Sequence, residues 1–172
     1  CIRDRGRQHE NDREATAADL KWLADPAEEP EPFGDGGTKM AWNTFNVVSI
    51  YPNGNPVMSD VNQRWVGDCC ACAVIASMAY LYPRFVKHII KDNMDKTYTV
   101  TMYDPKGKQI SVGVGGDYFI GNSGDLGALG GRNKEVTWAT ILEKAMIKWN
   151  QIYQGSSNVG GIGTEYLSLI HI

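Results

Sequence analysis

Residues 63–82 read QRWVGDCCACAVIASMAYLY, so that a polar approach runs directly into a long apolar segment. The part from Cys69 to Tyr82 contains no Gly or Pro and is apolar on every side, which is typical of a central buried helix. Asp68 stands where an N-cap residue is expected, immediately before the first cysteine of this segment. We therefore predict a buried helix over residues 69–82 whose first turn carries a thiol.

The sequence after this helix indicates two further helices and a pair of strands. Pro83 suits the first turn of a helix, and we expect a second helix near residues 84–92. Alternating apolar and polar residues on either side of a DPKG turn predict a β-hairpin over residues 97–114. Apolar residues at helical spacing predict a helix over residues 137–153 that packs on the core. Several polar residues lie off this apolar stripe: Glu143, Lys144, Lys148 and Asn150.

The remaining segments are rich in residues that interrupt regular structure. Residues 115–132 contain many glycines and are expected to form a long surface loop. Residues 1–37 are polar, acidic and rich in proline, which predicts a tail or linker that lies over the domain. The domain itself is expected to span residues 38–167, and residues 168–172 are expected to be a truncation artefact.

The composition fits one globular domain and excludes several classes of function. The chain has 172 residues, of which 42% are hydrophobic, and its formal net charge is −3, so no basic surface for nucleic acid is indicated. No apolar run is long enough to cross a bilayer as a helix. Cys1 would suit the lipidated mature N-terminus of a bacterial lipoprotein, or the chain simply starts within a longer protein. The sequence therefore leaves a cytoplasmic location and the bacterial cell envelope as alternatives.

Cys69, Cys70 and Cys72 lie close together, unlike the spread-out cysteines of a disulfide framework. They are therefore buried thiols, a reactive thiol or metal ligands. A thiol in the first turn of a helix faces unpaired backbone amides and the positive end of the helix dipole, which both favour the nucleophilic thiolate. Gln63 could turn its side-chain NH₂ group toward that sulfur and, with the Cys69 backbone N–H, stabilise an oxyanion. Alternatively the cysteines are small apolar fillers, the role that we expect of Cys70 and Cys72.

Two segments of the chain resemble the calpain family of cysteine proteases. The sequence QRWVGDC of residues 63–69, followed by a small-residue helix, is similar to that family's active-site segment Q-G-x-x-G-D-C-W-x-x-A. Residues 138–145, WATILEKA, resemble its W-x-x-L-L-E-K-A-Y-A-K segment. The resemblance spans residues 59–161 and implies an α+β fold. This would be the mostly helical papain-like N-terminal lobe, with a central buried helix and a small β-hairpin, truncated before the β-rich second lobe.

The resemblance also implies a function for this lobe. Cys69 would be the nucleophile and Gln63 the oxyanion residue of a cysteine endopeptidase that hydrolyses polypeptide substrates. Two positions depart from the family pattern, since Cys70 replaces a Trp and Arg64 replaces a Gly. The alternative is a catalytically inactive calpain-like module that serves for binding or as a scaffold.

The histidines of the chain do not match the family's catalytic base. In that family, a G-H-A-Y-like segment and an N-P-W-G-like segment of the second lobe supply the catalytic His and Asn, and neither segment occurs in this sequence. His9 lies in the polar tail, His88 is expected on a helix surface, and His171 stands next to the last residue. We therefore expect the missing His and Asn to lie beyond the C-terminus, so that this fragment is inactive alone.

Metal binding and redox chemistry are two further hypotheses, although the sequence itself requires no cofactor. By the resemblance, Asp60 occupies the position of a calcium-binding Asp and Glu135 lies near a second acidic position, so calcium is left open and the metal site is undefined. The CxxC of Cys69 and Cys72 also suits a thioredoxin-like protein, which needs a preceding buried strand that residues 62–68 do not resemble. A zinc site would need a second pair of ligands at suitable spacing, and the sequence lacks one.

Overall fold

The computed structural model describes residues 14–30, 41–121 and 123–154. Its elements in chain order are α1 (Ala17–Ala24), β1 (Ala41–Thr44), the short 3₁₀ helix η2 (Met58–Asp60), α2 (Cys69–Leu81), α3 (Pro83–Ile89), β2 (Ile90–Asp92), β3 (Tyr98–Tyr103), β4 (Gln109–Val114), β5 (Asp117–Ile120) and α4 (Trp138–Tyr153). The predicted artefact at residues 168–172 lies outside the described residues, as does much of the segment 1–37.

The strands of the described ranges form two small antiparallel sheets, one of β2, β3 and β4 in that order and one of β1 and β5. This mixture of helices and small sheets confirms the predicted α+β class. The finer assignment to a papain-like lobe stays a prediction.

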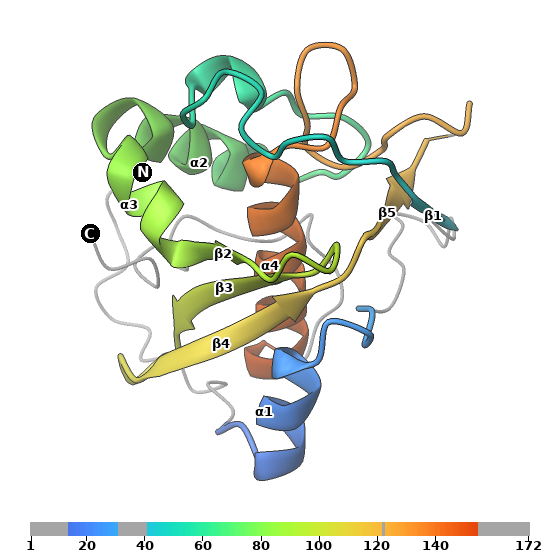
Figure 1. Ribbon diagram of the computed structural model, residues 1–172. Coiled ribbons are helices and arrows are strands. Elements are labelled where there is room, and N and C mark those ends of the chain that lie inside the picture. Colours follow the sequence, from blue (N-terminus) through green and yellow to red (C-terminus); the bar gives the residue numbers. More distant parts are fainter. Residues whose placement is uncertain (1–13, 31–40, 122, 155–172) are drawn as a thin grey trace.

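Helix α4 runs through the middle of the molecule, with the three-stranded sheet along one side of it (Figure 1). Thr137 caps its N-terminus by accepting a hydrogen bond from the Ala139 N–H at 3.3 Å. The predicted helix over residues 137–153 is confirmed. The polar residues off its apolar stripe are nevertheless buried: Glu143, Lys144, Lys148 and Asn150. Buried polar groups need hydrogen-bond partners, and segments distant in the sequence supply several of them here.

Helix α2 confirms the position of the predicted helix over residues 69–82, but it is not the fully buried central helix that we expected. One face of α2 is buried: Ala71, Ile75, Met78 and Ala79. The side chains of Tyr80 and Leu81 are 73% and 60% exposed. The main neighbours of α2 are η2 and α3, because α4 occupies the middle of the molecule. The apolar sequence therefore predicted the position of the helix correctly, but it overestimated how deeply the helix is buried.

The second helix ends earlier than residues 84–92 would suggest. Helix α3 stops at Ile89, and the next residues form β2, in which Ile90 lies opposite Val100 of β3. The side chains of both isoleucines are buried, and a β-branched residue such as Ile90 suits an extended strand. The β-hairpin predicted over residues 97–114 is confirmed, since β3 and β4 pair along their whole length.

The glycine-rich segment over residues 115–132 is not the surface loop that we predicted. It contains β5, which pairs with β1, and the side chains of Tyr118 and Phe119 are buried. Its glycines let backbone segments touch, because a Cβ atom on Gly127 would lie 2.8 Å from the Ile120 carbonyl carbon. Glycine therefore marks close packing here, and not exposure to solvent.

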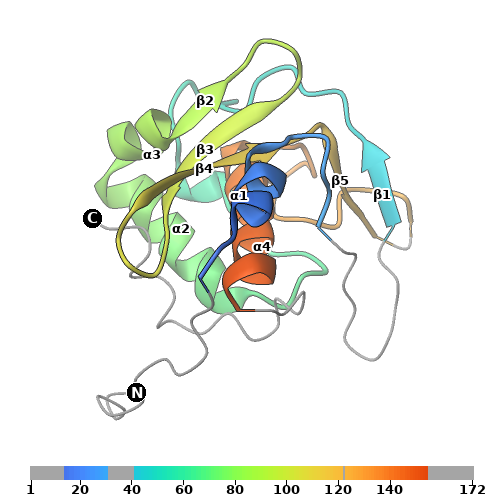
Figure 2. The same ribbon diagram turned by 90° about the horizontal axis from the view of Figure 1, so that it is seen from below.

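The segment before β1 packs against the core through α1. A capping box between Thr16 and Asp19 starts this helix, and Leu23 is fully buried. Helix α1 contacts α4 and β4, and the view from below shows it in front of α4 (Figure 2). This part of the predicted tail or linker therefore lies on the domain.

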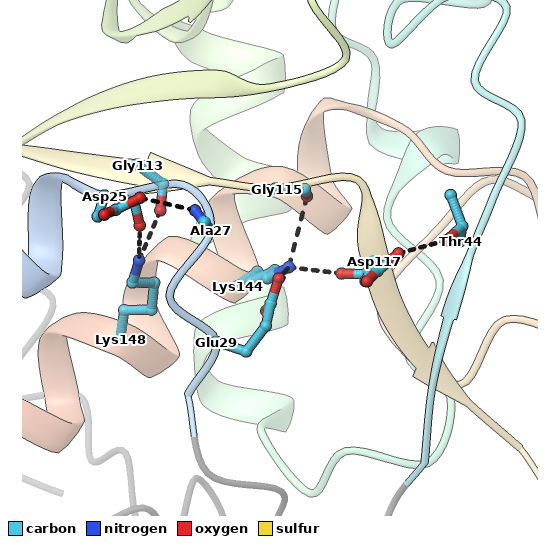
Figure 3. A network of polar contacts seen from close by, with 9 residues as sticks. All are labelled: Asp25, Ala27, Glu29, Thr44, Gly113, Gly115, Asp117, Lys144 and Lys148. Carbon is cyan, nitrogen blue, oxygen red and sulfur yellow. Dashed lines mark hydrogen bonds and ion pairs between the residues drawn. The ribbon is translucent and has the colours of Figure 1, made fainter.

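Two buried lysines of α4 hold the residues that follow α1 (Figure 3). The Lys148 ammonium donates hydrogen bonds to the backbone carbonyls of Asp25 and Gly113, each at 2.8 Å. The Lys144 ammonium forms an ion pair with the Glu29 carboxylate at 2.6 Å. Helix α4 thus joins the N-terminal segment to β4 through side chains that lie off its apolar stripe.

The stability of the fold should depend on pH through Lys148. Burial lowers the pKa of Lys148 from 10.5 to about 8, so the folded chain binds fewer protons than the unfolded chain between these two values. The free energy of unfolding of the wild type should therefore rise, relative to that of Lys148→Met, as pH increases through this window. Denaturant titrations at a series of pH values measure this difference.

The exposed Lys91 offers a matched control. The difference between wild type and Lys91→Met should stay constant over the same pH range. A constant difference for Lys148→Met as well would contradict the assignment of a buried, hydrogen-bonded ammonium group.

Candidate active site

The approach to α2 is a loop that is fastened to the glycine-rich segment. The Asn62 N–H donates to the Gly130 carbonyl at 3.0 Å. The Trp65 N–H donates to the Gly127 carbonyl, also at 3.0 Å. These bonds hold the backbone in place before α2 begins, so the first turn of the helix has a defined position.

Gln63 lies in this loop with an exposed side chain. Its Nε2 atom donates to the Val66 carbonyl at 2.9 Å. In this arrangement the NH₂ group faces its own loop. To meet a group bound at Cys69, the amide would have to give up this bond and rotate.

The three neighbouring cysteines have different surroundings. Cys69 is the first residue of α2, and its side chain is exposed. The charge of Cys69 and a hydrogen bond to it raise the pKa of the Cys70 thiol. Burial, followed by the charge of Asp68, raises the pKa of Cys72 far above its usual range. Cys70 and Cys72 are therefore held as neutral thiols, and Cys69 is the cysteine of this group that is open to a reactant.

Asp68 precedes α2 but does not cap it with its side chain. The side chain is 2% exposed, and burial raises the pKa of its carboxyl group. Its Oδ1 atom accepts a hydrogen bond from the Cys72 thiol at 3.3 Å, and its Oδ2 atom is buried without a donor among the described residues. The N–H groups in the first turn of α2 therefore donate no hydrogen bond to the Asp68 carboxylate. They remain available to stabilise negative charge beside Cys69.

Glu143 is a residue of this site that the sequence did not reveal. It stands on α4, is 2% exposed, and accepts a hydrogen bond from the Leu129 N–H at 2.9 Å. Burial raises the pKa of Glu143 well above its usual value, and the charge of Asp68 raises it further. Its position in the WATILEKA segment was a signal, but helical spacing alone placed it off the apolar stripe.

The structure does not bring a histidine of the described ranges next to Cys69. His88 is exposed in the last turn of α3. Helix α2 has 13 residues and so advances roughly 18 Å from Cys69 to its end. Helix α3, which carries His88 in its last turn, begins only after that end, at a bend of 112°. His9 and His171 lie outside the residues that the structure describes.

Asp60 is buried, and protein donors occupy its carboxylate. Its Oδ2 atom accepts from the Trp138 Nε1–H at 2.7 Å and from the Val57 N–H at 3.2 Å. Its Oδ1 atom accepts from the Asn53 side chain at 2.9 Å. The calcium site suggested at Asp60 and Glu135 gains no support, since no group of three or more His, Cys, Asp or Glu in the described part of the chain could hold a metal ion.

Comparison with known proteins gives no family for this chain, because neither the family models nor the curated proteins contain a match. In the described ranges, no single helix has both the length and the apolar character to cross a membrane. The consecutive helices α2 and α3 reach that threshold only together, with the 112° bend between them.

The bond between Asp60 and Trp138 should contribute to stability. Trp138→Phe should lower the free energy of unfolding by about 1–3 kcal/mol, because Asp60 stays buried without its indole donor. Denaturant unfolding measures the change. Trp65→Phe serves as the control, since that side chain is 59% exposed, and it should change stability by no more than about 0.5 kcal/mol. Equally small effects of both substitutions would contradict this role of Asp60.

Proposed function

We propose that this chain carries the nucleophile of a calpain-like cysteine endopeptidase, with Cys69 as the attacking residue and Gln63 as the oxyanion residue. The observation that carries the proposal is the position of Cys69, an exposed thiol on the first residue of α2. Asp68 turns away from the first-turn N–H groups, which supports the same role because these groups then remain available to negative charge. The QRWVGDC and WATILEKA segments add the resemblance in sequence.

The reaction would transfer the acyl group twice. The Cys69 thiolate attacks the carbonyl carbon of the peptide bond, so an S–C bond forms and the carbonyl oxygen becomes an oxyanion. The Cys69 N–H and the rotated Gln63 amide donate hydrogen bonds to that oxyanion. The C–N bond then breaks as the leaving amine takes a proton, which leaves a thioester. Water attacks the thioester, releases the carboxylic acid product and restores the thiol.

These proton transfers need a base at Cys69, and His88 lies away from that residue. We infer that a histidine and an orienting asparagine come from a second catalytic lobe, outside the described residues. Without them, nothing takes the thiol proton and nothing protonates the leaving amine. We therefore expect the chain to be inactive on its own.

One observation favours a different function, that of a catalytically inactive module for binding or scaffolding. The Gln63 amide donates to the Val66 carbonyl and does not face Cys69. The replacement of the family's Trp and Gly by Cys70 and Arg64 points the same way. Such a module would bind a polypeptide without cleaving it, so the reactivity of Cys69 separates the two functions.

Iodoacetamide should alkylate Cys69 at least about tenfold faster than Cys70 or Cys72 at neutral pH, because the thiolate is the reacting form and the other two thiols are held neutral. Tandem mass spectrometry after timed labelling measures the three sites separately. Cys69→Ser should remove the fast reaction, and unfolding in denaturant should abolish the difference. Equally slow labelling of all three cysteines in the folded chain would exclude a nucleophile.

The chain of 172 residues should not cleave casein or a fluorogenic peptide, because no histidine of the described residues lies next to Cys69. Cys69→Ala is the matched control and should give the same background signal. Cleavage by the wild type that disappears in Cys69→Ala would show that the chain contains its own base, and the inferred second lobe would then be wrong.

A further inference from the structure

Two buried carboxyl groups meet between α2 and α4. Asp68 comes from the residue before α2 and Glu143 from α4, and each side chain is 2% exposed. The two carboxyl groups interact, since the charge of Asp68 raises the pKa of Glu143. The Oδ2 atom of Asp68 and the Oε1 atom of Glu143 are buried and have no hydrogen-bond donor among the described residues. A proton shared between these two oxygens would satisfy both.

A hydrogen bond between two carboxyl groups requires a proton, because two carboxylates offer acceptors alone. Two negative charges in contact inside the protein would also repel each other strongly. The groups that face the pair indicate where the proton sits. Asp68 accepts from the Cys72 thiol, and Glu143 accepts from the Leu129 N–H. Burial raises the pKa of Glu143 well above its usual value, whereas hydrogen bonds partly offset the effect of burial on the pKa of Asp68, so the proton belongs on Glu143.

We propose that Glu143 is a positioning residue for Cys69: its protonated carboxyl group donates a hydrogen bond to Asp68 and so holds the start of α2 against α4. This inference rests on the proposed role of Cys69 as the nucleophile. An Asp before a helix ordinarily accepts hydrogen bonds from the N–H groups of the first turn. Here Glu143 draws the Asp68 carboxylate away from these groups and into the interior. The N–H groups then stay available to the thiolate and to the oxyanion.

The pair also fixes the charge next to the nucleophile. With the proton on Glu143, the two groups together carry a single negative charge, which is buried and hydrogen-bonded. Loss of the donor at Glu143 would leave Asp68 with two choices. It could stay inside without one of its partners, or it could turn outward, cap α2 and place its charge closer to Cys69. The outward turn, which brings negative charge next to the sulfur, would reduce the tendency of Cys69 to ionise.

Glu143→Gln and Glu143→Leu test this role. Gln keeps both bonds, since its Oε1 can accept from Leu129 and its NH₂ can donate to Asp68, whereas Leu keeps neither. Measured over a range of pH, the rate of Cys69 alkylation in Glu143→Gln should stay within about twofold of the wild type. In Glu143→Leu it should fall at least about threefold at neutral pH, with the profile displaced to higher pH. Glu28→Gln and Glu28→Leu make the same changes at an exposed site and should have no effect.

Infrared spectroscopy tests the proton directly, even if Glu143→Leu does not fold. The wild type at neutral pH should show the carbonyl stretch of a protonated carboxylic acid, and Glu143→Gln should lose it. Absence of the band, its persistence in Glu143→Gln, or equal slowing of Cys69 in Gln and Leu variants would overturn the inference. Failure of the proposed function has a different signature. In that case wild-type Cys69 would label no faster than Cys70, while the infrared band would still be present.

Discussion

The burial of α4 on every side is the constraint that organises this structure. A polar side chain on a buried helix must find a partner, since an unpaired buried polar group is costly. Lys144 and Lys148 find theirs in the segment after α1 and in the backbone of β4. Glu143 accepts a hydrogen bond from the Leu129 N–H, in the glycine-rich segment. The polar groups of one helix thereby hold together segments that lie far apart in the sequence.

The parts of the fold that follow from local patterns were predicted correctly. An apolar run without Gly or Pro indicated α2, helical spacing indicated α4, and alternation around a turn indicated the hairpin of β3 and β4. The errors arose where distant segments decide the structure. Residues 90–92 leave the helix because β3 is there to pair with them, and the glycines of 115–132 permit close backbone contacts that their number alone did not suggest. Likewise, the depth of α2 depends on α4 and not on its own composition.

The candidate site divides in the same way. Cys69, Gln63 and the position of Asp68 before the helix were visible in one continuous stretch of sequence. The burial of Asp68 and the role proposed for Glu143 were not visible, because Glu143 stands on another helix and local spacing carries no information about such a neighbour. The role of Asp60 was ambiguous for the same reason, because the sequence cannot distinguish a loop carboxylate that binds a metal from one that is exposed to solvent. Its burial against Trp138 depends on how η2 meets α4.

A nucleophile has two requirements that conflict in a small domain, because it must be open to a substrate and also held firmly in place. The interior meets the second requirement, but a group on α4 is enclosed and therefore inaccessible. Helix α2 resolves the conflict because it lies beside α4 with one face buried and the other exposed. Its first residue presents Cys69 to the outside, while the preceding residue reaches inward to Glu143. In the proposed function, the same helix start would be held in place from the interior and reactive toward solvent, with a single proton shared between the two carboxyl groups.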